Sequence, residues 1–505
     1  MEESFCELVN ARIGKAAMKK EKTAKVRSLA LDNVPFWTQE ETDEFRKTKK
    51  APLPEGVTNK GIYKDILTIA WPSMIELALT QLASMVDLMM VGQIHYNAVT
   101  AVGLTTQPKF ILMMLIQSLC VGTTAMVARF KGAGRPDRAN LIMRQSLMMT
   151  LVISAVLAVL GYIFANPLLR FVGANNETIK DAGDYLRIQM IGFVPLALTF
   201  VCTAALRGAG DSRTAMIYNT VANVVNVFFN WVLIYGNLGA PKLGIIGASL
   251  ATIIGQFTAF VIAMYKVMNK SPKQYLHLKL SDGFRPDKDA MAQIFSIGIP
   301  SMGEQLVMRV GMIIFGRLVV STGNIFYATH TVCMNIMSMS FMLGQAIAVS
   351  STSLVGQSLG KNRPDMAKQY SLRASTVGIA ASIVLAAVFI IFGKQLVGLY
   401  NDDPVVVETG AKIMFYIAFL QPFQCGQFVL AGSLRGAGDT RATAIITLIT
   451  VLGLRTGLGF IFIRLLDMGL FGAWYAIAAD QIVRTVLVVL RYSQGNWMFL
   501  KIRNA

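Results

Sequence analysis

Asp87 is the residue of this sequence whose setting points most directly to chemistry. We place it in mid-span, within an apolar run over residues 62–92. A carboxylate inside a membrane span costs about 3 kcal/mol or more to insert, so such groups usually face a cavity or a partner and serve ions or protons. A structural hydrogen bond or salt bridge is the alternative role. We predict that Asp87 binds a coupling cation.

Four asparagines provide a second polar feature. They lie in the apolar run 213–236 at spacings of four, three and four residues: Asn219, Asn223, Asn226 and Asn230. On a helix these side chains fall within about 60° of one another, in one narrow stripe. Since exposing four carboxamides to lipid would be costly, we expect the stripe to face the protein interior or a cleft. Hydrogen bonds between helices are the simpler role for such residues.

Long apolar runs position these residues. Of the 505 residues, 54% are hydrophobic and 15% are charged, whereas about 25% charged residues are typical of a soluble domain. Twelve runs lie near 62–92, 104–130, 139–165, 183–206, 213–236, 245–267, 290–321, 330–357, 367–393, 409–434, 441–465 and 469–492. They are too long and unbroken for barrel strands, so we predict an all-α protein with twelve transmembrane helices.

The positive charge of the chain is distributed like that of a membrane protein. Lys and Arg exceed Asp and Glu by 47 to 29, and the excess lies mostly in the short loops after the even-numbered runs. By the positive-inside rule, both termini are cytosolic in a multi-pass protein of the plasma membrane. This distribution argues against nucleic acid as a partner. Residues 1–60 and 496–505 are predicted cytosolic tails.

The chain repeats itself at an offset of 228 residues. The sequence Leu-Arg-Gly-Ala-Gly-Asp occurs at Leu206–Asp211 and again at Leu434–Asp439, and Glu76 recurs as Glu304 at the same offset. Because each repeat holds six spans, both have the same orientation, and a pseudo-two-fold axis along the membrane normal should relate two six-helix lobes. We predict lobes at 61–267 and 290–495, a cytosolic loop at 268–289, and a cavity between the lobes.

The repeat separates features that occur once from features that occur twice. Asp87 corresponds to Phe315, and the asparagine stripe corresponds to Thr447, Val451, Leu454 and Leu458. A site that is needed once can reside in one lobe, which supports an ion site in the first lobe. Glu76 and Glu304 occur in both halves, which favours a structural contact; a second proton or substrate site is the alternative.

The second half contains further charged residues within its runs. Three arginines could each pair with Glu304 or shape the cleft: Arg309, Arg317 and Arg455. Asp480 and Arg484 are four residues apart, a spacing that predicts a structural ion pair on one helix.

The repeated Leu-Arg-Gly-Ala-Gly-Asp segments are predicted to be turns. They lack the GxxxxGK[ST] pattern of a phosphate-binding loop. Glycine permits a tight turn between spans, and Asp211 and Asp439 could each cap the helix that follows.

With these features the sequence resembles the multidrug and toxic compound extrusion (MATE) transporters, over about residues 60–500. The resembling segments are Pro72-Ser73, Asp87–Gly92, the paired Arg-Gly-Ala-Gly-Asp loops, Asn226–Asn230, Gly247–Thr252 and Asp480 with Arg484. The resemblance implies two six-helix lobes that form a V around a central cleft. It also implies export of amphiphilic, often cationic, organic compounds, driven by influx of protons or sodium ions.

The resemblance also implies roles for particular residues. Asn226 and Asn230 match the polar pair beside the aspartate of the first span, so Asp87, Asn226 and Asn230 form the cation site, for H⁺ or alternatively for Na⁺. Some members have Asp where this chain has Asn230, and one fewer carboxylate favours H⁺. Asn219 and Asn223, with Glu76 and Glu304, form a second polar site or only join helices. In the family, bending of the first span is linked to the ionic state of its aspartate; Pro72 is the corresponding kink, or a fixed one.

Other functions fit the sequence less well. A flippase for lipid-linked substrates on a related architecture is the rival transport function. An intramembrane enzyme would need a cluster of His, Ser or carboxylates at one depth, which we do not find, and seven-span receptors do not match twelve spans. The three histidines share no ligand spacing and the five cysteines form no CxxC, so we expect no cofactor or resident metal. The expected partners are organic small molecules and membrane lipids, and the protein is predicted to be a monomer.

Overall fold

The described part of the chain is helical throughout. The computed structural model describes residues 29–48, 52–94, 96–269, 275–279, 281, 283 and 285–500. These residues contain no strand, which confirms the all-α prediction. Residues 1–28, 49–51 and 501–505 of the predicted tails, and part of the predicted loop 268–289, lie outside the described residues.

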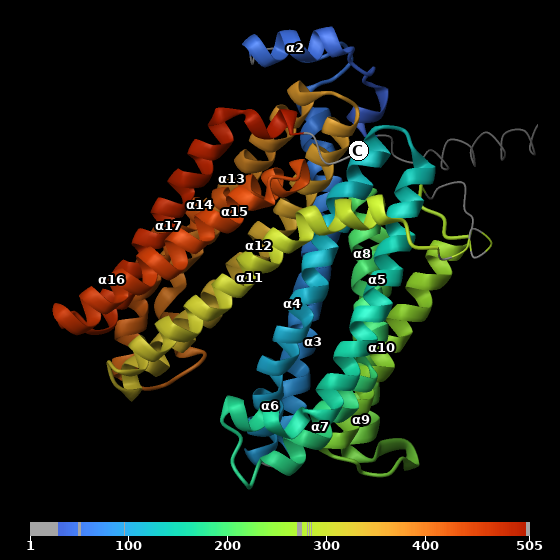
Figure 1. Cartoon of the computed structure of the whole chain (residues 1–505). Helices are drawn as coiled ribbons and strands as arrows, with labels where there is room; N and C mark the ends of the chain where they lie inside the picture. Colours follow the sequence, from blue (N-terminus) through green and yellow to red (C-terminus); the bar gives the residue numbers. More distant parts are fainter. Residues whose placement is uncertain are drawn as a thin grey trace, which may run out of the picture.

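Two bundles of helices make up the molecule (Figure 1). The first contains α3 (Asn59–Gly92), α4 (Tyr96–Gly132), α5 (Pro136–Ile163), α6 (Ala165–Val172), α7 (Ile179–Ile191), α8 (Phe193–Gly208), α9 (Ser212–Tyr235) and α10 (Ile245–Met268). The second contains α11 (Lys288–Val320), α12 (Asn324–Gly360), α13 (Pro364–Gly398), α14 (Pro404–Ala437), α15 (Thr440–Thr447), η4 (Leu448–Arg455), α16 (Thr456–Phe460), η5 (Ile461–Leu465) and α17 (Gly469–Gln494). We call these the first lobe and the second lobe; they meet at one end and diverge towards the other (Figure 1).

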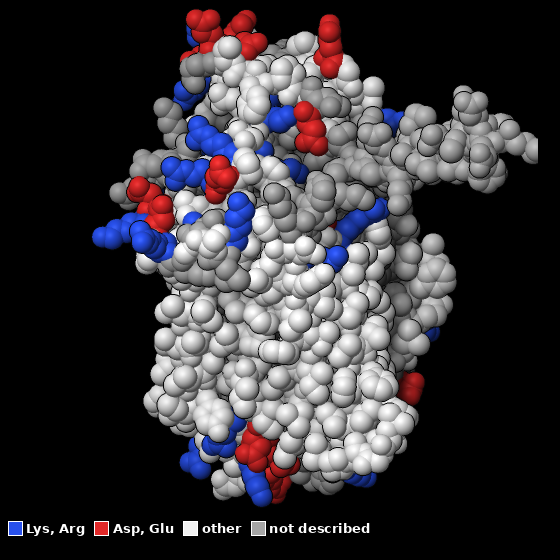
Figure 2. All heavy atoms as spheres, turned by 90° about the vertical axis from the view of Figure 1, so that its right-hand side faces the viewer, with Lys and Arg blue, Asp and Glu red and all other residues white. Residues whose placement is uncertain are grey.

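The predicted spans correspond to these helices. Ten helices of the described residues are long and apolar enough to cross a membrane, and α7 with α8 forms an eleventh span that is bent by 51°. The seventh predicted run corresponds to α11, which has 33 residues but is not among the helices that are apolar enough by this measure. Figure 2 shows charged side chains gathered at the two ends of one face, separated by a broad band of other residues, as expected for a surface that lies in lipid.

Two spans are less regular than the apolar runs indicate. The fourth span breaks at Gly192, where an added Cβ would lie 2.6 Å from Gln256 and 2.7 Å from Ile253 of α10. The eleventh span contains two π-helical segments, η4 and η5. Hydrophobic periodicity does not report such local changes, because they depend on contacts with neighbouring helices.

The lobes pack tightly where α4 and α12 end, at a region that we call the closed end. A Cβ added to Gly132 would lie 1.9 Å from the carbonyl oxygen of Gln357, and one added to Gly360 would lie 1.9 Å from that of Arg129. Gln357 also donates from Nε2 to the carbonyl of Gly208, at 3.0 Å. The two helices therefore cross with backbone against backbone, which only glycine allows here.

An N-terminal segment lies across the closed end. We call residues 29–37 the strap; it contains η1 (Ala30–Asn33), and α2 (Gln39–Thr48) follows it. Lys361 donates from Nζ to three strap carbonyls, those of Leu31 at 2.7 Å, Asp32 at 3.1 Å and Val34 at 3.3 Å. The guanidinium of Arg363 lies 4.5 Å from the ring centroid of Trp37. These contacts attach the strap to the second lobe.

The strap is attached to the first helix of the other lobe as well. The backbone N–H of Ala30 donates to Oδ2 of Asp65 on α3, at 2.8 Å. The hydroxyl of Tyr370, on α13, donates to the same oxygen at 2.7 Å. One carboxylate of the first lobe thus binds both the strap and the second lobe.

We expect Gly360→Ala to separate the lobes at the closed end. The clash is with a backbone oxygen of Arg129, so no side-chain rotation relieves it. Spin labels attached at Arg138 and Arg441, which are exposed in the first turns of α5 and α15, should show a longer distance in double electron–electron resonance than in the wild type. Gly103→Ala on α4 is the matched control, because nothing lies within 4 Å of its added Cβ. An unchanged distance distribution in Gly360→Ala would contradict this account of the closed end.

Candidate functional site

Helices α3 and α9 meet along a series of polar contacts in constant register. Three asparagines of α9 donate to residues of α3, and in each pair the residue numbers differ by 143: Asn219 to Glu76 at 2.6 Å, Asn223 to Thr80 at 3.2 Å, and Asn230 to Asp87. A constant difference means that the two helices run parallel. The structure therefore brings the predicted asparagine stripe against the predicted carboxylate face of the first span.

Asp87 is held by amides. Nδ2 of the fully buried Asn230 donates to Oδ1 of Asp87. With the amide of Asn226 in the orientation that satisfies both of its ends, Nδ2 lies 3.0 Å from Oδ1 and 3.2 Å from Oδ2 of Asp87, while its oxygen accepts from the backbone N–H of Thr252 at 3.2 Å. The oxygen of Asn230 has no hydrogen-bond partner among the described residues. The carboxylate thus lies beside a free amide oxygen, with no arginine bonded to it.

The position of Asp87 along α3 differs from the prediction. It lies five residues before the end of α3 at Gly92, about 8 Å along the helix axis, rather than at the middle of that helix. An apolar run shows that a residue belongs to a span but does not show its depth, because α3 has 34 residues and about 20 suffice to cross a bilayer. The site therefore lies towards the end of the helix that is remote from the closed end.

The site predicted from the sequence did not include Lys109 of α4. Nζ of Lys109 donates to Oε1 of Gln189 on α7, at 2.9 Å, and its ammonium interacts electrostatically with the carboxylate of Asp87. Gln189 in turn donates to Oγ of Ser249 on α10, at 3.3 Å. A lysine inside the predicted span 104–130 was a signal for this residue, because an ionisable group within a membrane span usually has a partner.

Glu76 and Glu304 form the same ion pair in the two lobes. Arg207 lies 2.8 Å from Glu76, and Arg435 lies 2.6 Å from Glu304; in each pair the residue numbers differ by 131. The second oxygen of Glu304 accepts from the hydroxyl of Thr443 at 2.9 Å. These pairs join each lobe's first span to its Leu-Arg-Gly-Ala-Gly-Asp segment, in keeping with a structural role for both glutamates.

Pairing with Glu304, one of the two roles considered for the arginines of the second half, is not found for Arg309 or Arg455. The guanidinium of Arg309 lies 4.4 Å from the ring centroid of Phe110 on α4, and Arg455 binds Asp480, with its Nε 2.9 Å from Oδ2. The ionic partner of Glu304 is Arg435, which comes from a segment distant in sequence.

The predicted pair of Asp480 and Arg484 is present and has a third member. Nη2 of Arg484 donates to both oxygens of the fully buried Asp480, at 2.6 and 2.7 Å. Arg455, the last residue of η4, completes the cluster from the other side. The hydrogen bonds that Asp480 accepts come from arginines. Asp480, Arg455 and Arg484 therefore form a structural ion cluster rather than an exchangeable site.

The Leu-Arg-Gly-Ala-Gly-Asp turns follow the prediction only in part. Gly210 and Gly438 have φ of +79° and +90°, which favours glycine. Asp211 caps α9 by accepting from the N–H of Thr214 at 3.1 Å. Asp439 does not cap α15; it pairs with Arg491 of α17 at 2.8 Å instead.

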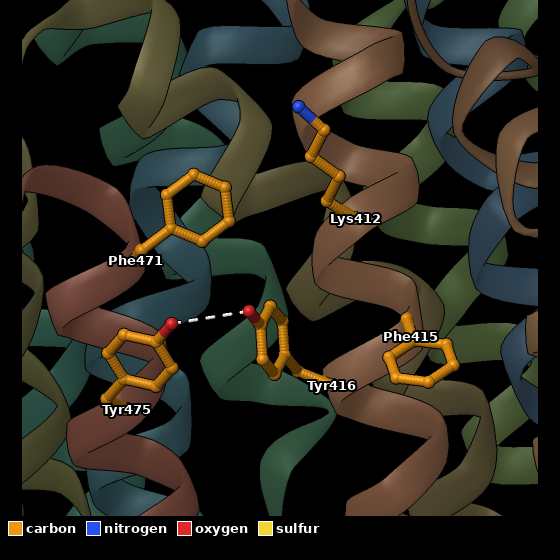
Figure 3. Close-up of a pocket in the computed structure, with 5 residues that line it drawn as sticks. All are labelled: Lys412, Phe415, Tyr416, Phe471 and Tyr475. Carbon is orange, nitrogen blue, oxygen red and sulfur yellow. Dashed lines mark hydrogen bonds between the residues drawn. The ribbon is translucent and has the colours of Figure 1, made fainter.

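A pocket of about 420 Å³ lies on the second lobe between α14 and α17, and Figure 3 shows its lining side chains. The lining residues are Lys412, Phe415, Tyr416, Phe471 and Tyr475. The hydroxyls of Tyr416 and Tyr475 lie 3.3 Å apart. Aromatic side chains with a lysine are typical of the membrane–water interface, and none of these residues belongs to the set around Asp87.

We expect Glu304→Gln to lower stability. The change keeps the side-chain shape but leaves Arg435 without its charge partner; because the two side chains are 10% and 25% exposed, the free energy of unfolding should fall by about 2 kcal/mol rather than the 3–5 of a fully buried pair. Denaturant unfolding of the purified protein measures this. Glu408→Gln, on the exposed face of α14, is the control. Equal stability of the two variants would remove the structural role of the pair.

Comparisons with known proteins agree with this architecture. The MatE family model matches residues 72–232 and 300–461, two segments whose starts are separated by the repeat offset of 228. A probable multidrug resistance protein NorM of Thermotoga maritima is 28% identical over 437 residues, which cover 86% of this chain and 93% of that protein. The multidrug resistance protein PmpM of Pseudomonas aeruginosa is 27% identical over 463 residues, covering 89% and 95%.

The fold is also found among solved structures. An outward-facing multidrug resistance MATE transporter of the MOP superfamily superimposes with a TM-score of 0.80, at 22% identity, over 87% of this chain and 97% of that chain. This likeness concerns the fold. The family match, which covers most of both lobes, carries the assignment, and the chain therefore belongs to the MatE family of multidrug and toxic compound extrusion transporters.

Proposed function

We propose that this transporter is a cation-coupled antiporter that exports amphiphilic, often cationic, organic compounds by alternating access. The observation that carries the proposal is the carboxylate of Asp87, which lies within the first lobe, is held by two neutral amides and has no arginine bonded to it. Asp480, Glu76 and Glu304 all have arginine partners. Asp87 is the carboxylate of these four that remains available to exchange a cation.

The amides around Asp87 suit a group that changes charge. As a carboxylate, Asp87 accepts from Asn226 and Asn230; as a carboxylic acid it would need an acceptor for its own O–H. The unpartnered oxygen of Asn230 is such an acceptor once the amide rotates, because an amide carries both donors and acceptors. Both charge states can therefore be hydrogen-bonded, which keeps the free-energy difference between them small.

The charge pattern gives the proposed orientation. The basic loops that follow α4 and α12 lie at the closed end, so the positive-inside rule assigns the closed end to the cytosol. Both tails are then cytosolic, and the described conformation is closed to the cytosol. Asp87, remote from the closed end, is accessible from outside, where the coupling cation enters. We further propose lobe boundaries at 61–267 and 290–495, a plasma-membrane location and a monomeric transporter.

The proposed cycle links Asp87 to the direction of opening. Substrate loads from the cytosol, and a cation then binds at Asp87 from outside and favours substrate release and return to the inward state. One charge moving down 100 mV supplies about 2.3 kcal/mol, enough to bias such an equilibrium about fiftyfold. Pro72 lies inside the continuous helix α3, where its missing N–H leaves a point at which the helix can bend.

The arginines of the spans favour antiport over the flippase alternative. A flippase for anionic lipid-linked substrates would use a cleft lined with free basic groups. Four arginines at or within the spans are instead paired with carboxylates: Arg207, Arg435, Arg455 and Arg484. Their charges are neutralised within the protein. Two further basic groups of the spans have other contacts, since Arg309 lies over the ring of Phe110 and Lys109 donates to Gln189.

We expect Asp87→Asn to abolish gradient-driven transport while the protein still folds, because the amide cannot exchange a cation. Uptake of a fluorescent organic cation by everted vesicles, under an imposed pH or sodium gradient, measures this. Glu76→Gln is the matched control on the same face of α3; it loses the ion pair with Arg207 and some stability but should keep its response to the gradient. Undiminished coupled uptake by Asp87→Asn would reject the proposal.

A further inference from the structure

The strap is attached to the second lobe by two basic side chains. Nζ of Lys361 donates to three strap carbonyls and lies 5.6 Å from the ring centroid of Phe36. Nη1 of Arg363 donates to the carbonyl oxygen of Pro35 at 3.3 Å, and its guanidinium lies over the ring of Trp37. Because hydrogen bonds from charged donors are stronger than those between neutral groups, this attachment is firm.

Helix α2, which follows the strap, is attached to the second lobe as well. Phe45 of α2 is 4% exposed and lies in a buried cluster with second-lobe residues, among them Leu359, Ala367 and Leu434. The guanidinium of Arg46 lies 5.1 Å from the ring centroid of Phe499, which comes after the end of α17. A movement of the second lobe would therefore carry both the strap and α2 with it.

The attachment of the strap to the first lobe is smaller. Among the described residues, one hydrogen bond joins the strap to α3, from the backbone N–H of Ala30 to Oδ2 of Asp65 at 2.8 Å. Apolar side chains of the strap and of α3 also share one buried cluster with residues of α12 and α13: Leu29, Leu31, Val34, Ile62, Ile66, Leu354 and Met366. The strap thus lies between the lobes but binds the second lobe by more hydrogen bonds.

Two of the polar groups that bind the strap have no charged counterpart in the other half of the repeat. At the offset of 228, Asp65 corresponds to Gln293 and Lys361 corresponds to Ala133. The glutamate–arginine pairs, which join helices within each lobe, occur in both halves. Asp65 and Lys361 are therefore not part of the arrangement that the lobes share, and contact with the strap is what the two residues have in common.

We propose that the strap is a releasable lock of the closed end: it remains on the second lobe and detaches from α3 whenever the closed end opens. This inference rests on the proposed function, since it names a contact that alternating access has to break. In the described conformation the strap bridges the lobes and adds to the free energy that is needed to separate them. Residues 38–58 connect the strap to α3, so the strap stays close to its site after release and can bind again.

The first test fixes the strap to α3 with a disulfide. Cβ of Ala30 lies 3.5 Å from a Cβ added to Gly61, and a disulfide needs about 3.5–4.5 Å between these atoms. The variant is Ala30→Cys with Gly61→Cys in the full chain, with Cys6→Ser to remove the cysteine of the N-terminal tail. Oxidation should lower the uptake of a fluorescent organic cation by everted vesicles on the order of tenfold, because the bonds of Lys361 and Arg363 would then have to break instead. Reductant should restore the rate.

The single variants Ala30→Cys and Gly61→Cys are the matched controls, and oxidation should leave their rates unchanged. The reduced double variant shows that the two substitutions themselves are tolerated. Undiminished uptake by the oxidised double variant, with the disulfide shown to be complete by mass spectrometry, would overturn the lock.

The second test weakens the lock. Lys361→Ala removes three hydrogen bonds to the strap and copies Ala133 of the first half. In double electron–electron resonance between labels at Arg138 and Arg441, the ratio of long to short distances should rise on the order of tenfold over that of the labelled wild type. Lys60→Ala is the control, because Lys60 is exposed in the first turn of α3 and takes part in none of the strap contacts described above. Equal distance distributions of Lys361→Ala and the wild type would count against the inference.

The outcomes separate this inference from the proposed function. Coupled transport that survives Asp87→Asn rejects the proposed coupling site, whereas the distance measurement still reports the lock because it does not depend on transport. Conversely, gradient-driven uptake that is insensitive to the disulfide overturns the lock and leaves Asp87 as the proposed coupling site.

Discussion

The parallel docking of α3 against α9 is the contact on which the proposed coupling chemistry depends. Three asparagine contacts at one residue difference fix the register, so a slip by even one residue would remove the amides from Asp87. The same register places Glu76 beside the first Leu-Arg-Gly-Ala-Gly-Asp turn. A structural ion pair and the carboxylate that is proposed to exchange a cation thus share one helix interface.

The two lobes share one arrangement of helices but differ in the side chains of their interiors. Both keep the glutamate–arginine pair at the same residue separation. Beyond it they differ: the first lobe has Asp87 and Lys109 where the second has Phe315 and Met337, and the second has Asp480 and Arg484 where the first has Thr252 and Gln256. Asp480 is locked between two arginines, whereas Asp87 is held by amides. Of these two carboxylates, Asp87 is the one without an arginine partner among the described residues.

The closed end is the second part of the structure on which the proposed alternating access depends. Backbone contacts at Gly132 and Gly360 leave no room for side chains between α4 and α12. The strap adds hydrogen bonds across the junction, since it accepts from Lys361 and donates to Asp65. Opening at this end has to break contacts of both kinds together. Such close packing favours discrete over gradual rearrangement, and in the proposed cycle a change of charge at Asp87 favours one of two arrangements.

The sequence alone determined the all-helical class, the span limits to within about eight residues, the internal repeat and the polar faces of the first and fifth spans. These properties follow from composition and periodicity, which are local. Tertiary structure decided which distant residues meet: Arg435 rather than a nearby arginine beside Glu304, Arg455 at Asp480, and Lys109 in the field of Asp87. It also decided where Asp87 lies along the neighbouring helices and where the fourth span breaks, at Gly192. Both depend on the packing of side chains between helices, which the hydrophobic periodicity of one helix does not report. The charge on a buried group depends on its spatial neighbours. The chemistry of the site can therefore be inferred only when the packing of the helices is known.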